Sequence, residues 1–404
     1  MDLSWTPEQQ AFRLELRSWL DANRTWDRDA GPPTFHDLPA EVAFLRDWQA
    51  RLADGGWVGV TWPVAYGGRG ATAGDHFIVQ EELARAGAPE LAGRIGVNLA
   101  GPTLLAHGTE EQKARWLPHI LSAREMFCQL FSEPDAGSDL AALKTSAERV
   151  DGGWRMTGQK VWTSYAQFAD WGLCLARTNH DVAKNRGITY FVVDMHAAGV
   201  QVRPLRQLTG EDEFNEVFLD SVFVPNDQVI GDVDHGWQVT SATLSHERGI
   251  NPRQLVKHIQ LVDDLLAIAE QTGAFDDPRL QTLLAQAFAD IRIFQLHNYR
   301  TLSRLARGQQ PGPEGSLLKL YWSERSKQVH DTAMRVLGAA APLWRGAADN
   351  PADGAWQRSW LYYQSASIFA GTNEVQRNII GERVLGLPRE PRAEPSKADR
   401  KAAS

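Results

Sequence analysis

Cysteine is the scarcest residue type in this sequence. Only Cys128 and Cys174 occur among the 404 residues. Two thiols cannot build a disulfide framework, and they are too few for a set of metal ligands. We therefore expect a fold without disulfide staples and a protein without a metal centre.

Long apolar runs are also missing. No stretch approaches the roughly 18 apolar residues that a membrane-spanning helix needs. Residues 1–7 show no basic segment followed by an apolar stretch of the secretory type. These absences predict a cytoplasmic protein with no membrane span.

Basic residues are in deficit. The chain has 42 Lys and Arg against 50 Asp and Glu, which gives a formal net charge of -8. A general nucleic-acid-binding protein needs a basic excess to neutralise phosphates. We therefore expect no nucleic-acid partner.

Tryptophan, in contrast, is abundant, with 15 residues. Large aromatic rings fill cores and subunit interfaces, and packing is the simpler interpretation of this number. The alternative is that some of these rings line a ligand site. One of them, Trp162, belongs to a motif described below.

The first third of the chain has the periodicity of helices. Residues 6–9, Thr-Pro-Glu-Gln, have the order of an N-cap, a first-turn proline and a capping-box glutamine. Apolar residues then recur at helical spacing as far as Leu20. The pattern returns over residues 40–53 and, with breaks, over residues 75–122.

Between about residues 126 and 230 the pattern is that of strands. Asp151-Gly152-Gly153 separates two short β-rich runs, as in a hairpin. Residues 188–193 form a compact β-rich run, and residues 216–225 alternate apolar and polar side chains before a proline. Strands at this spacing predict a small antiparallel barrel or sandwich.

Helical periodicity resumes at Gly236 and is interrupted at residues 308–315. The end of the chain is rich in Pro, Lys, Arg and Ala, which predicts a disordered tail. The sequence thus predicts an α+β protein. Its expected parts are an N-terminal helical domain (1–125), a β-domain (126–235), a C-terminal helical domain (236–388) and a tail (389–404).

Residues 129–140, QLFSEPDAGSDL, have the composition of a loop. Proline and glycine fix its turn, while serine and aspartate cap nearby N–H groups. Such a loop exposes backbone amides and a hydroxyl, which suits an anionic or carbonyl-rich ligand. Taken alone, an ordinary structural turn is the simpler interpretation.

Two further motifs allow both a structural and a ligand-binding interpretation. Residues 158–164, GQKVWTS, end a strand, and a buried Trp162 beside a serine would form a flat wall for a tricyclic cofactor. Near the C-terminus, Gly371-Thr372 precedes an apolar helical stretch and predicts a capped helix start. Helix N-termini favour anions, but most caps are only caps.

Taken together and in this order, the motifs resemble the acyl-CoA dehydrogenase family. The likeness rests on S-E-P-x-A-G-S-D, G-Q-K-x-W-T-S, E-V-F-x-x-V-x-V-P and A-G-T-N-E-V-Q-R-x-I-I-G, and it extends over about residues 5–387. It implies an FAD enzyme that forms a double bond between Cα and Cβ of an acyl-CoA thioester. The implied fold has an N-terminal α-helical domain, a middle β-domain and a C-terminal four-helix bundle.

The resemblance also implies which residues contact the cofactor. Phe131 and Ser132 would lie near the pyrimidine edge of the flavin, and Ser164 near its N5 atom. Ser138 would reach either the flavin or the CoA arm. The full set implied for FAD is Gln129, Phe131, Ser132, Gly137, Ser138, Trp162, Ser164, Thr372 and Glu374.

The catalytic base is where the sequence departs from the commonest pattern of the family. Many relatives carry Glu directly before the C-terminal Gly-Thr, whereas this chain has Ala370. A second subset has its base on an earlier helix, directly before an arginine, and here Glu247 precedes Arg248. The resemblance therefore assigns the α-proton to Glu247; the alternative is a solvent-exposed ion pair. The residues implied for the substrate are Ser138, Ser245, Arg248, Ala370 and Gly371.

Two other departures concern the adenine end of FAD. Residues 273–277, GAFDD, stand where the family has R-x-x-F, and residues 338–341, GAAA, replace a glycine-rich turn. This end of the cofactor is then held differently, or by a non-identical partner. A homo-oligomer (dimer or tetramer) and a heterotetramer with a related subunit both stay open.

The resemblance implies electron-transfer flavoprotein as the electron acceptor. Two other functions also stay open: an acyl-CoA oxidase that uses O₂, and a structural subunit of a heteromeric acyl-CoA dehydrogenase. A small residue at 370 leaves space near Cα. This favours a branched or bulky acyl group, such as a sterol side chain.

Overall fold

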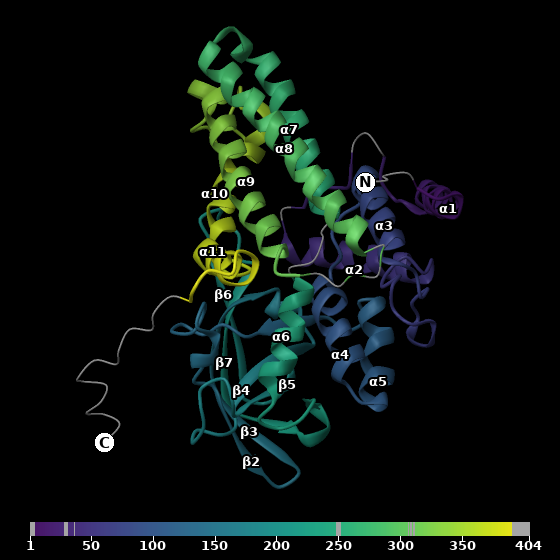
Figure 1. Cartoon of the computed structure of the whole chain (residues 1–404), viewed down its shortest axis with the longest axis vertical. Helices are drawn as coiled ribbons and strands as arrows, with labels where there is room; N and C mark the ends of the chain where they lie inside the picture. The colour runs from purple at the N-terminus through teal and green to yellow at the C-terminus, as the bar shows by residue number, and fades with distance from the viewer. Residues whose placement is uncertain are drawn as a thin grey trace, which may run out of the picture.

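The computed structural model describes residues 5–27, 31–35, 37–247, 252–305, 307, 309 and 312–389, without the side chains of residues 245–247. The predicted disordered tail lies, from residue 390 onward, outside these residues. Helices come first, strands second and helices last (Figure 1). The predicted α+β fold class is therefore confirmed.

The N-terminal helices begin where their capping residues predict. Thr6 and Gln9 form the expected capping box, and Thr72 and Thr109 start two later helices in the same way. Tryptophans fill the core of this region, with Trp48 and Trp116 almost fully buried, which confirms the packing interpretation for most of these rings. The helices are α1 (Pro7–Asn23), α2 (Leu38–Asp54), α3 (Ala73–Arg85), α4 (Gly101–His107) and α5 (Glu110–Leu121).

The middle of the chain forms an eight-stranded sheet with the order β6-β7-β3-β2-β4-β5-β8, in which β1 pairs with β4. The predicted hairpin joins β2 to β3, with Val150 opposite Gly153. Most neighbours are antiparallel, as predicted, but β4 pairs in parallel with both β1 and β2. The strands are β1 (Phe127–Leu130), β2 (Ser146–Val150), β3 (Gly153–Ser164), β4 (Trp171–Arg177), β5 (Ile188–Asp194), β6 (Val200–Leu205), β7 (Phe214–Pro225) and β8 (Val229–Ile230).

The C-terminal helices form a tall bundle above the sheet (Figure 1). Its apolar stripes meet in a core that includes Leu265, Phe294 and Ala333. The helices are α6 (Gly236–Glu247), α7 (Pro252–Gln271), α8 (Pro278–Leu305), α9 (Gly315–Leu337), α10 (Ala355–Tyr363) and α11 (Asn373–Ile379). Helix α6 stands apart from the bundle, because it packs on β5 and α4.

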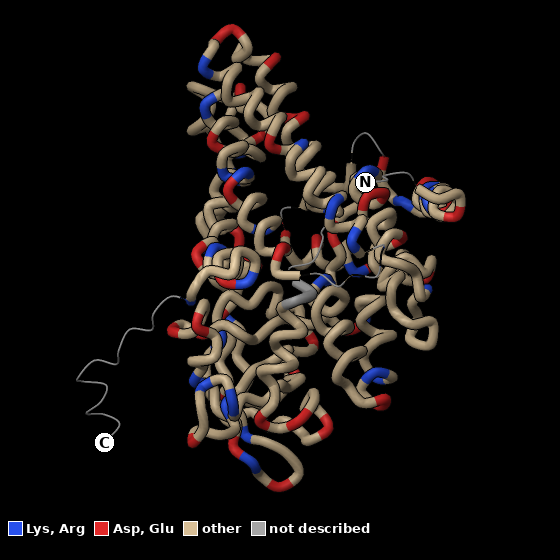
Figure 2. The backbone as a smooth tube through the Cα atoms, in the orientation of Figure 1, with Lys and Arg blue, Asp and Glu red and all other residues tan. Residues whose placement is uncertain are grey.

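Charged residues of both signs are interspersed along the described chain (Figure 2). No basic stripe separates from the acidic positions in this view, in keeping with the net charge of -8. Within the described residues, no helix combines the length and the apolar character that crossing a membrane requires.

Candidate active site

A buried ion pair fixes the first of the predicted ligand loops. Lys160 of β3 is fully buried, and its ammonium donates to a carboxylate oxygen of Glu133 at 2.9 Å. It also donates to the backbone oxygens of Phe131 and Leu175, at 3.2 and 2.8 Å. Backbone N–H groups of residues 144–145 complete the shell of Glu133, at 2.6 and 2.9 Å. The loop is thus tied to strands β3 and β4 of the sheet.

The electrostatics of this pair favour the charged forms. Burial by itself would raise the pKa of Glu133, but Lys160 and the surrounding N–H donors outweigh it and hold the pKa below its ordinary value. The sequence analysis missed this pair. The signal was present as a lysine within the strand motif of residues 158–164 and a glutamate in the loop.

The predicted contacts of the loop divide into a buried side and an accessible side. The ring of Phe131 is buried and meets Tyr190 edge to face, with 5.8 Å between ring centroids. The carbonyl of Ser132 accepts from Val161 N–H at 2.9 Å, which adds β3 as a support. Of the loop residues predicted for FAD, those that keep solvent access are Gln129, Ser132, Gly137 and Ser138.

Trp162 is exposed, and the expectation of a buried ring is wrong for this chain. The register of β3 against β7 shifts between Lys160 and Thr163, and Trp162 takes a left-handed backbone conformation with φ of 60°. This bulge turns the indole away from the sheet, so that it is 62% exposed. The rings of Trp162 and Phe214 lie edge to face, with 6.3 Å between their centroids. A strained backbone that presents a flat ring is typical of a ligand site.

The end of β3 beyond this bulge is incompletely satisfied. The Thr163 hydroxyl is buried and has no hydrogen-bond partner among the described residues. Ser164 is half-buried and closes the strand opposite Phe214. Asn215 secures the segment by donating to the Thr163 carbonyl at 3.0 Å. A buried hydroxyl without a partner is uncommon in an otherwise well-bonded strand.

The C-terminal Gly-Thr segment forms a strained turn followed by a capped helix, as predicted. Ala370 and Gly371 have φ of 54° and 83°. Gln376 donates to both of their carbonyls, at 3.2 and 3.1 Å. The Thr372 hydroxyl accepts from the N–H of Val375 and caps α11.

Helix α11 is anchored to α9 by a residue that the sequence analysis did not single out. Asn373 is buried and donates to Glu324 at 2.6 Å. Its side-chain oxygen accepts from Lys319 and Ser323, at 3.0 and 2.9 Å. Glu374 instead points to solvent and pairs with Arg377, at 3.3 Å. The turn at 370–372 is therefore held from the bundle side.

Helix α6 carries the predicted base at its last residue. Arg248 and the side chains of Ser245 and Glu247 lie outside the described residues. Earlier in the helix, the Thr243 hydroxyl shares a hydrogen bond with that of Thr103 on α4, at 2.7 Å.

The same Thr243 hydroxyl donates to the Tyr190 hydroxyl at 3.4 Å. Because Tyr190 packs on Phe131, the helix with the predicted base is connected to the first ligand loop. Of the predicted residues, the structure thus links the loop at 131–133 to the end of β3 through Lys160 and to α6 through Tyr190.

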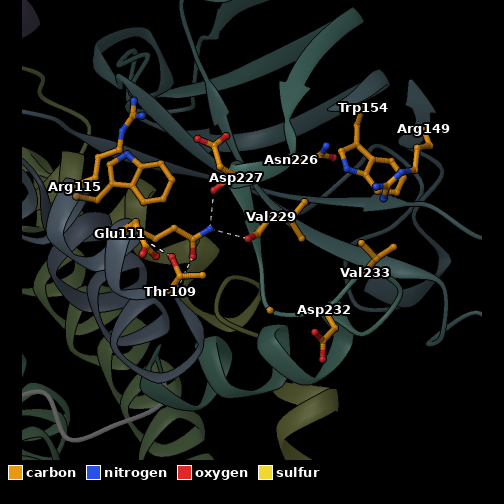
Figure 3. A pocket seen from close by; sticks show the side chains of 13 residues that line it. Thr109, Glu111, Arg115, Arg149, Trp154, Asn226, Asp227, Val229, Asp232 and Val233 are labelled. Carbon is orange, nitrogen blue, oxygen red and sulfur yellow. Dashed lines mark hydrogen bonds between the residues drawn. The ribbon is translucent and has the colours of Figure 1, made fainter. Parts of the chain in front are cut away.

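One cavity lies elsewhere, between α5 and the far end of the sheet (Figure 3). It has a volume of about 650 Å³, and Gln112 crosses it to bond the carbonyls of Asp227 and Val229 at 2.7 and 2.8 Å. None of the residues predicted for FAD or substrate lines it. We therefore build the candidate site on the two motif turns and α6, and not on this cavity.

Thiol and metal chemistry find no support in the described residues. Cys128 and Cys174 are buried, and burial raises the pKa of both thiols, that of Cys174 to about 11. Neither is therefore a ready nucleophile. No group of three or more His, Cys, Asp or Glu in the described chain could hold a metal ion.

The succession of helices, strands and helices, with the capped turn before α11, agrees with the fold that the motifs imply. Comparisons with known proteins give the particular family. Its N-terminal, middle and C-terminal domains, each described as a domain of acyl-CoA dehydrogenase, match residues 6–124, 128–222 and 234–385. The chain belongs to the acyl-CoA dehydrogenase family and is an oxidoreductase that acts on acyl-CoA.

Relatives of the chain include enzymes of actinobacteria. "Acyl-CoA dehydrogenase IpdE1" of Mycolicibacterium smegmatis is 39% identical over 400 residues, which are 95% of this chain and 99% of that protein. The solved structure of a "Tcur3481-Tcur3483 steroid ACAD" superposes with a TM-score of 0.84 at 30% identity, over 96% of this chain and 100% of that one. The ChsE4-ChsE5 complex from Mycobacterium tuberculosis gives 0.82 at 32% identity, over 96% and 100%.

FAD is the cofactor of this family, and the described residues fit its ring system. Trp162 offers an exposed flat ring, the loop at 131–136 is held rigid by Lys160, and the turn at 370–372 supplies backbone groups. The fit is weaker at the adenine end. The resemblance implies that residues 273–277 belong to that end, and the short turn they form, Ala274–Asp276, has no arginine and an exposed Phe275.

Proposed function

We propose that this protein removes the α-proton and the β-hydride of an acyl-CoA thioester, with the Glu247 carboxylate as the base. The observation that carries the proposal is the turn at Ala370. It has a strained backbone but no carboxylate, while α6, tied to the loop of Phe131 through Tyr190, carries Glu247. A base is required because the α-proton of a thioester is only weakly acidic.

Substrate would tune a base at Glu247. Acyl-CoA packed against the carboxylate would desolvate it. Desolvation raises the pKa of a glutamate toward the working pH, as a general base needs.

The other predicted residues would hold the reactants around this base. When bound, FAD supplies the acceptor for the hydride. Trp162 would stack against its ring system. The backbone N–H groups at 370–371 would donate to the thioester oxygen, where negative charge develops. The remaining contacts that we propose are Gln129, Phe131, Ser132, Gly137, Ser138, Ser164, Thr372 and Glu374 for FAD, and Ser138, Ser245 and Arg248 for the substrate.

We infer that the acyl group is bulky. Ala370 replaces a much longer side chain at the position before Gly371, which frees space beside the reacting carbons. The name of one structural relative, a steroid ACAD, points the same way. A branched or ring-containing thioester is therefore the expected substrate class, and a sterol side chain is one example.

We also propose that the working enzyme is an assembly of subunits. Two structural relatives are named as pairs of different chains, and residues 273–277 lack the usual contact to the FAD pyrophosphate. A heterotetramer with a related subunit explains both. The proposed electron acceptor is electron-transfer flavoprotein.

The deciding experiment compares the wild type with Glu247→Gln. The purified protein is titrated anaerobically with straight, branched and steroid-side-chain thioesters while its flavin absorbance is recorded. We expect one class to bleach the wild type, and we expect Glu247→Gln to stay yellow but react roughly a thousandfold more slowly. Glu148→Gln, which removes an exposed carboxylate of β2, is the matched control.

Each outcome has a clear meaning. Unimpaired bleaching in Glu247→Gln would show that Glu247 is not the base. Peroxide formed at the rate of flavin reoxidation in air would favour the oxidase. A colourless wild type that turns yellow only when a second chain is co-expressed would place the missing FAD contacts on that partner.

A further inference from the structure

Arg94 reaches the end of β3 from the N-terminal helices. It stands just before η2 (Gly96–Ala100), a π-helical turn that packs against α6. Its guanidinium carbon lies over the ring of Tyr165, 5.5 Å from the centroid. Tyr165 directly follows Ser164 and has a left-handed backbone with φ of 53°. A cation from one part of the fold therefore lies over the strand end that we propose for the flavin.

Tyr362 of α10 brings the C-terminal helices to the same place. Its ring lies 6.4 Å from that of Phe369, the residue before Ala370. Burial raises the pKa of Tyr165 to about 12 and also raises the pKa of Tyr362, and in both cases the charge of Arg94 opposes the shift. Arg94 is thus close to both phenols. We refer to Arg94, Tyr165 and Tyr362 as the Arg–Tyr cluster.

The polar groups of the Arg–Tyr cluster are unused by the rest of the described chain. No described residue accepts a hydrogen bond or forms an ion pair with Arg94, although its side chain is half-buried. The hydroxyls of Tyr165 and Tyr362 have no hydrogen-bond partner among the described residues either. A guanidinium has only donors to offer, and half-buried donors without acceptors are costly.

Four carboxylates lie near the cluster: Glu41, Glu90, Glu211 and Glu213. Glu211 is paired with Arg358, and the side chain of Glu41 forms no ion pair or hydrogen bond with a described residue. Glu90, four residues before Arg94, is held by Arg253 and Lys257 at 3.0 and 2.5 Å. These two cations and Arg94 outweigh the effect of burial, so that the pKa of Glu90 falls to about 2. Glu213 accepts from Gln207 at 2.7 Å. None of the four accepts a hydrogen bond from Arg94, so among the described residues the donors of Arg94 have no acceptor and are available to a ligand.

We propose that the Arg–Tyr cluster recognises an acceptor oxygen on the acyl group, away from the thioester. The inference rests on the proposed function, because it uses the acyl group as the ligand between the end of β3 and the turn at Ala370. A carboxylate or a ketone oxygen fits the donors of Arg94 and the two phenols. The substrate class is thus an oxygenated acyl-CoA, in preference to a plain hydrocarbon chain.

The test uses three thioesters of one chain length on the flavin-loaded enzyme: hexanoyl-CoA, 5-oxohexanoyl-CoA and adipoyl-CoA. Hexanoyl-CoA has no further oxygen group, 5-oxohexanoyl-CoA has a ketone, and adipoyl-CoA has a carboxylate. We expect kcat/KM to favour one oxygenated thioester over hexanoyl-CoA by roughly tenfold or more. Arg94→Gln should reduce that ratio about tenfold. Arg85→Gln removes the same charge from α3, where the side chain is 54% exposed, and should leave the ratio as in the wild type.

Calorimetric binding of the same thioesters separates this inference from the proposed function. The proposed reaction itself is judged from the wider panel of straight, branched and steroid-side-chain thioesters. If none of the three thioesters used here reduces the flavin, the binding preference alone decides the inference. If hexanoyl-CoA is bound and turned over as well as the other two, the inference is overturned. It is equally overturned if Arg94→Gln weakens the binding of all three thioesters by the same factor, because the loss of a merely structural role would have that effect. A preference for the ketone over the carboxylate, or the reverse, identifies which oxygen the cluster selects.

Discussion

No charged side chain among the described residues is more deeply buried than Lys160. Its loss should therefore be costly in a specific way. Replacing Lys160 by Met leaves Glu133 buried without its counter-charge, and we expect a loss of roughly 3–5 kcal/mol in the free energy of unfolding. We also expect weaker FAD binding, because the loop at 131–136 loses its anchor. Denaturant unfolding and flavin titration measure the two effects.

The double variant Lys160→Met/Glu133→Gln is the control for this prediction. Removing both charges takes away the unpaired carboxylate, so most of the lost stability should return. FAD affinity should stay low, since the ties from Lys160 to Phe131 and Leu175 are still missing. If the double variant is less stable than the single one, the buried charge is not what destabilises the protein.

At this scale the sequence motifs indicate candidate residues for the site but not how those residues are oriented. The motif that contains Trp162 was recognisable, whereas the bulge that exposes its ring was not. A bulge depends on the pairing of β3 with β7, and residue 214 lies far away in the sequence. The ion pair of Lys160 and Glu133 was missed for a related reason. Burial of a lysine is a property of the folded sheet, and a strand lysine is normally exposed.

At the scale of elements, the bundle contains two buried histidines that should make its stability depend on pH. His258 of α7 and His330 of α9 are 4% and 0% exposed. Burial lowers the pKa of His258 to about 3 and that of His330 to about 4. In the unfolded chain both have a pKa of about 6.5. The folded state thus prefers the neutral rings, and their contribution is complete above pH 6.5.

The sign of the effect follows directly. As pH falls below 6.5 the unfolded chain takes up protons that the folded bundle refuses, so the free energy of unfolding decreases. For each histidine, the free energy of unfolding falls by about 1.4 kcal/mol per pH unit until the pH reaches the pKa of that histidine in the folded state. Unfolding at pH 7, 6 and 5 should show this slope, and His258→Gln should make it shallower. His180→Gln changes a histidine on an exposed loop and is the control; an equal slope in His258→Gln would contradict the prediction.

Elements were more predictable than their partners. Local signals were sufficient for three helices: a capping box and periodicity for α1, and periodicity alone for α2 and α9. The parallel pairing of β1 and β2 with β4 was not predictable from alternation, which says nothing about the neighbour of a strand. The same holds for the anchoring of α11 by Asn373. The sequence signal for this anchor is a single asparagine, and the hydrogen-bond partners of Asn373 lie on α9.

At the scale of the whole molecule, one face of α8 offers a surface for the proposed assembly. Phe288, Ile293 and Leu296 are 44%, 42% and 55% exposed, whereas Leu284, Ile291 and Phe294 of the same helix face the core. Apolar side chains gathered on one exposed face mark an interaction site. We define Phe288, Ile293 and Leu296 as the outer face of α8 and predict that a neighbouring subunit covers it.

Leu296→Lys tests this prediction, because a charge buried in an apolar interface is poorly tolerated. We expect the assembly to dissociate at least tenfold more readily in sedimentation or mass photometry. Leu14→Lys places the same charge on α1, at a leucine that is 59% exposed, and should leave the assembly intact.

Flavin content adds a second measurement. If a neighbouring subunit completes the adenine end of the FAD site, the dissociated Leu296→Lys protein should also lose its yellow colour. An assembly of unchanged mass would show that the outer face of α8 is not the interface. Dissociation with full retention of flavin would instead show that one chain holds FAD alone, despite the missing arginine at residues 273–277.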